Sequence, residues 1–149
     1  MAQTYFGSTL RAGSGTLTDT VDGGFVAMSQ TTTVTTVAAG TATSATLTLP
    51  ASSQIINILI DVVQDEVVGG GTATTLPVTV GTAAAGTQYV SSTDVFAGGR
   101  AAITFTTAQL LAMSDIGSNT SVVITADPNG TISTTQAIIR MTVVYAQKV

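Results

Sequence analysis

Alternation between hydrophobic and polar residues is the main pattern of this chain, and it predicts β-strands. The clearest example is the segment 53–63. One face of this predicted strand consists of Ile56, Ile58, Ile60 and Val62. The other face mixes hydrophobic and polar residues. One wholly hydrophobic face and one mixed face are typical of a central strand in a β-sandwich.

Further strands follow from the same alternation and from many Thr, Val and Ile residues, whose branched Cβ atoms favour extended backbone. Segments that contain Gly or Pro separate them and predict turns. The predicted strands are 25–37, 45–49, 53–63, 76–80, 101–105, 121–126 and 134–147. Residues 82–99 are predicted to be mostly loop, anchored by Tyr89, Val90, Val95 and Phe96.

A short helix and a closing hairpin complete the predicted elements. One or two helical turns are expected after Thr107 as the N-cap, and they should bury Leu110, Leu111 and Met113. Residues 127–130, Asp-Pro-Asn-Gly, suit a type I turn. We therefore expect the strand before this turn to pair with the strand after it.

Six to eight strands between Gly-rich turns predict an all-β protein, an antiparallel β-sandwich of jelly-roll-like type. The sandwich is expected to form a single domain over residues 25–149. Residues 1–24 differ, because five glycines stand among Ser and Thr residues, and they predict an extended N-terminal arm. The bulky side chains early in this arm are Tyr5, Phe6, Leu10 and Arg11.

Two interpretations of the arm are open. Its four bulky side chains form a candidate interface with a neighbouring subunit, because extended segments often become ordered when they bind. Alternatively, the arm is a first strand of its own sandwich and places these side chains in the core, since termini are ordered where something holds them.

The composition excludes several kinds of chemistry. The chain has 149 residues with no His, no Cys and no Trp. It therefore lacks an imidazole base, a thiolate nucleophile and the ordinary ligands of zinc and iron–sulfur sites. The four basic residues are scattered and cannot neutralise a row of phosphates, so we expect no nucleic-acid partner. The longest hydrophobic run, Ile55–Ile60, is far shorter than a bilayer-spanning helix, so we expect no membrane partner.

The low charge points to contact with other protein. Charged residues make up 8% of the chain and 30 of the 149 residues are Thr, whereas about 25% charged residues are usual in soluble domains. A surface of Thr, Ser, Gln and Gly carries little electrostatic repulsion and tolerates close contact. This composition is typical of an assembly subunit rather than of a free enzyme.

Three short motifs have a chemical interpretation besides a structural one. Asp61 and Asp65 offer a carboxylate pair for hydrolysis, although their spacing does not make them converge. The turn 127–130 offers oxygen ligands for calcium, but it has a single acid. Residues 69–72 are Gly-rich but lack the Lys of a phosphate-binding loop. We therefore expect no catalytic residue, no metal site, no cofactor and no enzymatic activity.

Four segments together resemble a pattern found in small structural proteins of tailed-phage particles. The first is the alternating strand 55–63. The second ends in Gly81-Thr82, and a loop with Tyr89 and Asp94 follows it. The last is the late segment 141–145, Met-Thr-Val-Val-Tyr. The chain is similar in these segments to capsid decoration (cement) proteins and to head-fibre and related head proteins.

This resemblance implies a structural virion protein. Decoration proteins are β-rich and often trimeric, and they bind the outer capsid surface near three-fold positions. The expected partners are the major capsid protein and further copies of this chain, in a homo-oligomer expected to be a trimer, and the expected location is the capsid surface of the virion. The alternative is a phage head-fibre, spike or tail subunit that binds a host surface.

Overall fold

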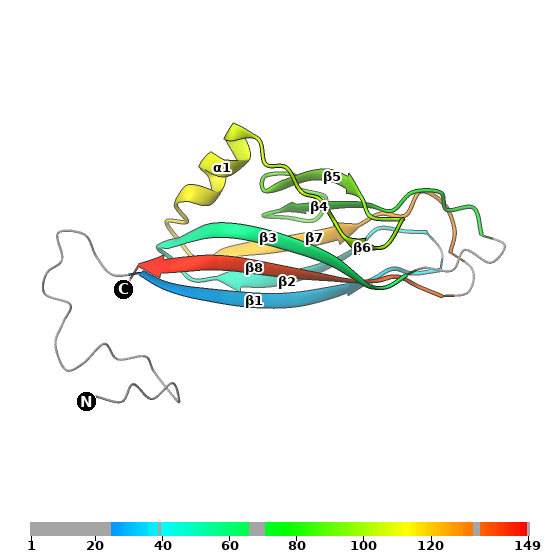
Figure 1. Cartoon of the computed structure of the whole chain (residues 1–149), viewed down its shortest axis with the longest axis horizontal. Helices are drawn as coiled ribbons and strands as arrows, with labels where there is room; N and C mark the ends of the chain where they lie inside the picture. The colour runs from blue at the N-terminus through cyan, green and yellow to red at the C-terminus, as the bar shows by residue number, and fades with distance from the viewer. Residues whose placement is uncertain (1–24, 39, 66–70, 133–134, 149) are drawn as a thin grey trace, which may run out of the picture.

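In the residues that it describes, the computed structural model of the protein consists of two facing β-sheets and one short helix (Figure 1). It describes residues 25–38, 40–65, 71–132 and 135–148. Within these ranges the elements, in chain order, are β1 (Phe25–Thr35), β2 (Thr43–Leu49), β3 (Ser53–Gln64), β4 (Pro77–Gly81), β5 (Val90–Asp94), β6 (Gly99–Arg100), α1 (Thr107–Ser114), β7 (Thr120–Ala126) and β8 (Ile138–Lys148).

Each of the first four strands pairs with one of the last four, in reverse order along the chain. β1 pairs with β8, β2 with β7, β3 with β6 and β4 with β5, all antiparallel. Two further pairings, β3 with β8 and β4 with β7, complete sheets of order β1-β8-β3-β6 and β2-β7-β4-β5. Eight strands wrapped in this way into a double sheet form a jelly roll. The predicted all-β antiparallel sandwich is therefore confirmed, while the predicted arm, residues 1–24, lies outside the described residues.

The inward faces of the two sheets meet in one hydrophobic core. In β8, the alternate residues Ile139, Met141, Val143 and Tyr145 are each at most 1% exposed, as their spacing predicts. The Nε2 atom of Gln30 donates to the Tyr145 hydroxyl at 3.0 Å, so the polar end of this side chain is satisfied. The facing sheet contributes Leu47, Leu49, Val78, Val80, Val122 and Ile124.

A β-bulge in β3 breaks the alternation predicted for that strand. Its pairing with β8 shifts between Ile55 and Asn57, which leaves Ile56 as an extra residue. Ile55 and Ile58 are therefore both buried, whereas Ile56 is 53% exposed. The prediction that Ile56 shares a buried face with Ile58 and Ile60 is wrong, because an extra residue changes the face on which the residues to either side of it lie.

The predicted hairpin at the end of the chain is also wrong. β7 and β8 lie in different sheets, and the residues between them connect one sheet to the other. The amides of Asp127 and Asn129 donate to the carbonyls of Pro77 and Thr75, at 3.0 Å each. The turn sequence fixes only the local direction of the backbone. Each of the two strands is flanked on both sides by other strands of its sheet, so neither is free to pair with the other.

Two predictions in the middle of the chain are wrong as well. Residues 90–94, predicted as loop, form β5, in which Val90 alone is buried, so hydrophobic alternation gives no signal there. Residues 101–105, predicted as a strand, belong to no sheet. Ile103 and Phe105 instead pack against the core from an extended connection. Their alternation reflects burial on one side rather than strand pairing.

Three loops meet at the end of the sandwich where β1 finishes. Gly40 packs against the backbone of Gly130, and Gly130 packs against the backbone of Thr72. Both glycines have positive φ angles, 67° and 116°, which other residues adopt only under strain. The amides of Thr72 and Ala73 donate to the Thr131 carbonyl at 3.0 and 3.1 Å. These contacts join the β1–β2, β3–β4 and β7–β8 loops. They leave no room for a Cβ atom on Gly40 or on Gly130.

Candidate functional site

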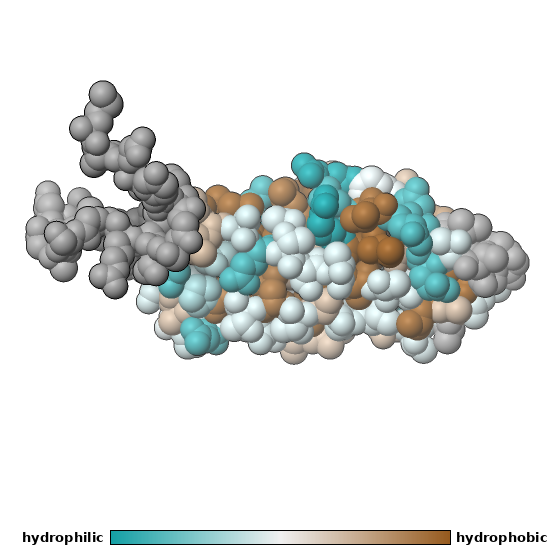
Figure 2. All heavy atoms as spheres, turned by 90° about the horizontal axis from the view of Figure 1, so that it is seen from below, coloured by the Kyte–Doolittle hydropathy of each residue, from teal (hydrophilic) through white to brown (hydrophobic). Residues whose placement is uncertain are grey.

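The outer face of the sheet β1-β8-β3-β6 is open within the described part of the chain, whereas the other sheet is partly covered. Val123 and Thr125 face outward from β7 but are buried, and the Ala85 amide donates to the Thr125 hydroxyl at 2.9 Å. Figure 2 is seen from below Figure 1 and looks onto the β1 edge of the sandwich, where a mostly pale surface carries separate brown and teal regions. We use the name open sheet face for Ala27, Ser29, Thr31, Thr33, Thr35, Ile56, Leu59, Asp61, Arg100, Ile138, Arg140, Thr142 and Val144.

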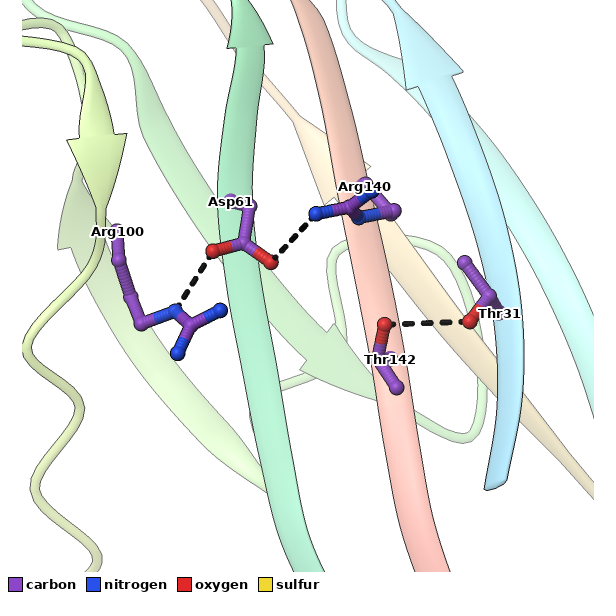
Figure 3. Close-up of polar contacts among 5 residues, drawn as sticks. All are labelled: Thr31, Asp61, Arg100, Arg140 and Thr142. Carbon is purple, nitrogen blue, oxygen red and sulfur yellow. Dashed lines mark hydrogen bonds and ion pairs between the residues drawn. The ribbon is translucent and has the colours of Figure 1, made fainter.

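A row of charged side chains crosses the open sheet face (Figure 3). Asp61 lies opposite Arg140 of β8 on one side and opposite Arg100 of β6 on the other. The Nε atom of Arg100 donates to Asp61 Oδ1 at 2.7 Å, and Nη2 of Arg140 donates to Oδ2 at 3.2 Å. In a neighbouring row, the hydroxyls of Thr31 and Thr142 are 3.2 Å apart. Asp61 therefore links β3 to both neighbouring strands, and two arginines against one carboxylate leave a net charge of +1.

The two arginines keep the Asp61 carboxylate ionised. The hydrogen bond from Arg100 has the largest effect and lowers the pKa of Asp61 below its usual 3.8. Partial burial opposes this change, and the hydrogen bond from Arg140 reinforces it. A general acid needs a raised pKa, so this carboxylate is set up for cross-strand pairing rather than for proton donation. The carboxylate of Asp65, the other member of the predicted pair, packs against Gly98.

Replacing Asp61 by Asn should remove a pH-dependent contribution to stability. At pH 7 we expect Asp61→Asn to lower the free energy of unfolding by up to about 1 kcal/mol, as for other exposed ion pairs. Folding lowers the pKa of Asp61 below its usual 3.8. The contribution to stability is therefore complete above pH 3.8, and it is lost as the pH falls through the lower pKa of the folded state. Urea denaturation from neutral to acidic pH should show that the difference in free energy of unfolding between wild type and Asp61→Asn shrinks below pH 3.8.

A matched substitution separates this effect from a general loss of negative charge. Asp115 makes no ion pair within the described residues, so Asp115→Asn removes one negative charge and leaves the Asp61 row intact. A difference between wild type and Asp61→Asn that stays constant down to acidic pH would contradict the role given to Asp61.

The helix α1 presents hydrophobic side chains to solvent. Leu110 and Leu111 are 52% and 74% exposed, whereas Gln109 and Met113 are buried one turn apart on the opposite side. The prediction that the two leucines are buried is therefore wrong, and the prediction for Met113 is confirmed. In Figure 1 the helix stands at the edge of the sandwich, so only one of its sides can touch the core.

The buried Gln109 fixes the orientation of α1. The N-cap is Thr106 rather than the predicted Thr107, and the two ends of a capping box are present. The Thr106 amide donates to Gln109 Oε1 at 2.9 Å, and the Gln109 amide donates to the Thr106 hydroxyl at 3.3 Å. The Nε2 atom of Gln109 also donates to Ser91 Oγ at 2.9 Å, in β5. With Gln109 held inward by these bonds, the leucines are directed away from the core.

Three further points concern the predicted arm, metal ligands and membrane-spanning helices. The predicted arm interface, formed by Tyr5, Phe6, Leu10 and Arg11, lies outside the described residues. Within the described ranges, no three His, Cys, Asp or Glu side chains gather closely enough to hold a metal ion. None of the helical structure in those ranges has the length and hydrophobicity of a bilayer-spanning helix.

Comparisons with known proteins do not assign this chain to a family. No family model matches the sequence, and neither a curated protein nor a solved structure matches the chain. The jelly roll occurs in viral capsid domains, in lectins and in cupins, so the fold does not select one function among them.

Proposed function

We propose that this protein is a decoration (cement) protein of a tailed-phage head, which binds the outer surface of the assembled capsid as an oligomer and stabilises it. The observation that carries the proposal is the open sheet face, a broad surface on a jelly roll whose side chains are mostly small, hydroxylated or aliphatic and whose three charged residues are paired with one another. Jelly rolls occur in viral capsid domains. The resemblance of segments such as 55–63 and 141–145 to head proteins supports the same proposal.

The side chains of the open sheet face suit a lasting contact with protein. Its charged residues are the three of the Asp61 row, and these largely neutralise one another. Thr, Ser and Ala lose less conformational entropy on burial than long side chains such as Lys or Glu. The charges that such a contact would bury are already paired, because both carboxylate oxygens of Asp61 accept from an arginine. Pairing lowers the cost of removing charged groups from water.

Stabilisation of a capsid by such a subunit follows from mass action. A protein that binds the assembled shell, and not its separated parts, lowers the free energy of the shell by its binding free energy. Several weak contacts act together when copies of the subunit are joined, so a homo-oligomer, with a trimer as the expected state, increases occupancy at low concentration. No catalytic group is required for this function.

The second candidate function is host-surface binding by a head-fibre, spike or tail subunit. It is favoured by the exposed arginines and hydroxyls of the open sheet face, because glycans are bound through such polar groups. Arg100 and Arg140 are 62% and 46% exposed in their side chains. This function predicts binding of the isolated protein to host cells, whereas the decoration function predicts binding to phage heads.

Sedimentation with phage heads tests the proposed function. Heads of the phage that encodes this chain, purified without the protein, should carry added protein to the pellet up to a fixed ratio. Thr31→Glu places an unpaired charge on the open sheet face and should weaken this binding at least about tenfold, because burying an unpaired charge in a contact is costly. Thr46→Glu places the same charge at an exposed position of β2, on the other sheet, and should bind like wild type.

The outcomes of this experiment separate the candidates. Protein that remains in the supernatant with heads but sediments with host cells would favour the fibre or spike function. Equal binding of Thr31→Glu and wild type would show that a different surface makes the capsid contact. A fixed binding ratio that only Thr31→Glu weakens would support the proposal.

A further inference from the structure

We infer that the exposed leucines of α1, Leu110 and Leu111, are the docking site for residues 5–10 of a second copy of this chain. The inference goes beyond the proposed capsid contact, since it concerns the contact between copies and names both of its sides. It requires no capsid, so the two proposals can fail independently.

The exposed side of α1 is hydrophobic and held in place. Ala108, Leu110, Leu111 and Ala112 are all exposed, and none of the eight residues of the helix is charged. Gln109 anchors the opposite side through its hydrogen bonds to Thr106 and Ser91, so a rotation that buried the leucines would break these bonds. Adjacent hydrophobic side chains that a rigid helix holds in water mark a surface that binds another protein segment.

The N-terminal residues supply a segment of matching chemistry. Residues 5–10, Tyr-Phe-Gly-Ser-Thr-Leu, contain three large hydrophobic side chains and no charge. Between this segment and Phe25, where β1 begins, lie the residues 11–24. Fourteen residues can span up to about 45 Å when extended. A linker of this length allows the segment to dock well away from Phe25, on a neighbouring subunit as well as on its own.

The places of β1 and α1 on opposite edges of the fold suit a head-to-tail contact between two copies (Figure 1). Phe25 pairs with Lys148, and Ser53 pairs with Gln147, so β1 and β3 both begin at the same end of their sheet. The Ile116 amide, just after α1, donates to the Ser53 carbonyl at 2.7 Å, which fixes the helix at that end too. β1 nevertheless lies on the opposite edge from α1 (Figure 1). With donor and acceptor on opposite edges, copies can join head to tail, and such contacts form a ring when the rotation between copies closes and a filament when it does not.

The mass of the protein in solution tests the inference. Light scattering should give a mass several times 14.9 kDa for the wild type. Leu111→Glu, and separately removal of residues 1–12, should each weaken self-association at least about tenfold. Val63→Glu places the same charge at another exposed hydrophobic position, 56% exposed in β3, and should associate like wild type. A wild type that stays monomeric at every concentration, or a Leu111→Glu variant with wild-type association, would overturn the inference.

Disulfide trapping identifies the two sides of the contact directly. The chain contains no Cys, so an engineered thiol has no natural cysteine to react with and can form a disulfide only with another engineered thiol. A mixture of Phe6→Cys and Leu111→Cys proteins should form a linked pair under mild oxidation, whereas Phe6→Cys mixed with Val63→Cys should not. If the mixture does not link, and a chain carrying both Phe6→Cys and Leu111→Cys closes on itself, then the segment docks within its own subunit and the inference is wrong.

Discussion

We expect Gly40→Ala to lower the free energy of unfolding by about 2–5 kcal/mol, the sum of two separate costs. The φ angle of Gly40 is +67°, and an L residue in this region costs roughly 1–2 kcal/mol. An added Cβ would also collide with the carbonyl group of Gly130, which is backbone and cannot rotate away. Forcing an extra carbon into a closed site costs about 1–3 kcal/mol more.

Two other glycines separate the strain from the collision. Gly99 has φ +78° with open space around its Cβ position, so Gly99→Ala should cost the strain alone, about 1–2 kcal/mol. Gly117 has open space and no positive φ, so Gly117→Ala should be neutral or slightly stabilising. Urea denaturation of the three variants should rank them in that order. Equal losses for Gly40→Ala and Gly99→Ala would mean that the loop junction at Gly130 is looser than described.

The fold class could be predicted because inward faces repeat with a period of two. In β8 the alternation of hydrophobic residues matches the buried row from Ile139 to Tyr145, and no local feature competes with it. The order of strands could not be predicted in the same way. Phe25 pairs with Lys148 from the other end of the chain, and alternation shows that a strand is buried on one side without showing which strand lies next to it.

The functional surfaces were harder to predict, for two physical reasons. Asp61 is paired with Arg100 and Arg140, which lie 39 and 79 residues further along the chain, so sequence proximity gives no signal. In α1, hydrophobicity alone predicts that the leucines are buried. The spacing of Thr106 and Gln109 is that of a capping box and could have placed the start of the helix correctly. The burial of Gln109 depends on Ser91 in a strand that alternation does not detect.

We expect Ile60→Ala to lower the free energy of unfolding by about 2–5 kcal/mol, because it leaves a cavity in the centre of the core. Ile60 is 0% exposed and lies opposite Met141, which is also fully buried. Ile56→Ala removes the same atoms from the same strand, but Ile56 is 53% exposed. Its loss should stay below about 1 kcal/mol, as for most surface substitutions.

The variant Ile55→Ala tests whether the β-bulge causes the difference in stability loss between Ile60→Ala and Ile56→Ala. Simple alternation places Ile55 on the opposite face from Ile60 and places Ile56 on the same face as Ile60. The bulge buries Ile55 at 3% exposure, so Ile55→Ala should cost nearly as much as Ile60→Ala when all three variants are unfolded in urea. A large loss for Ile56→Ala with a small loss for Ile55→Ala would mean that β3 runs without the bulge. Ile56 would then belong to the core, and the open sheet face would lose one of its exposed hydrophobic side chains.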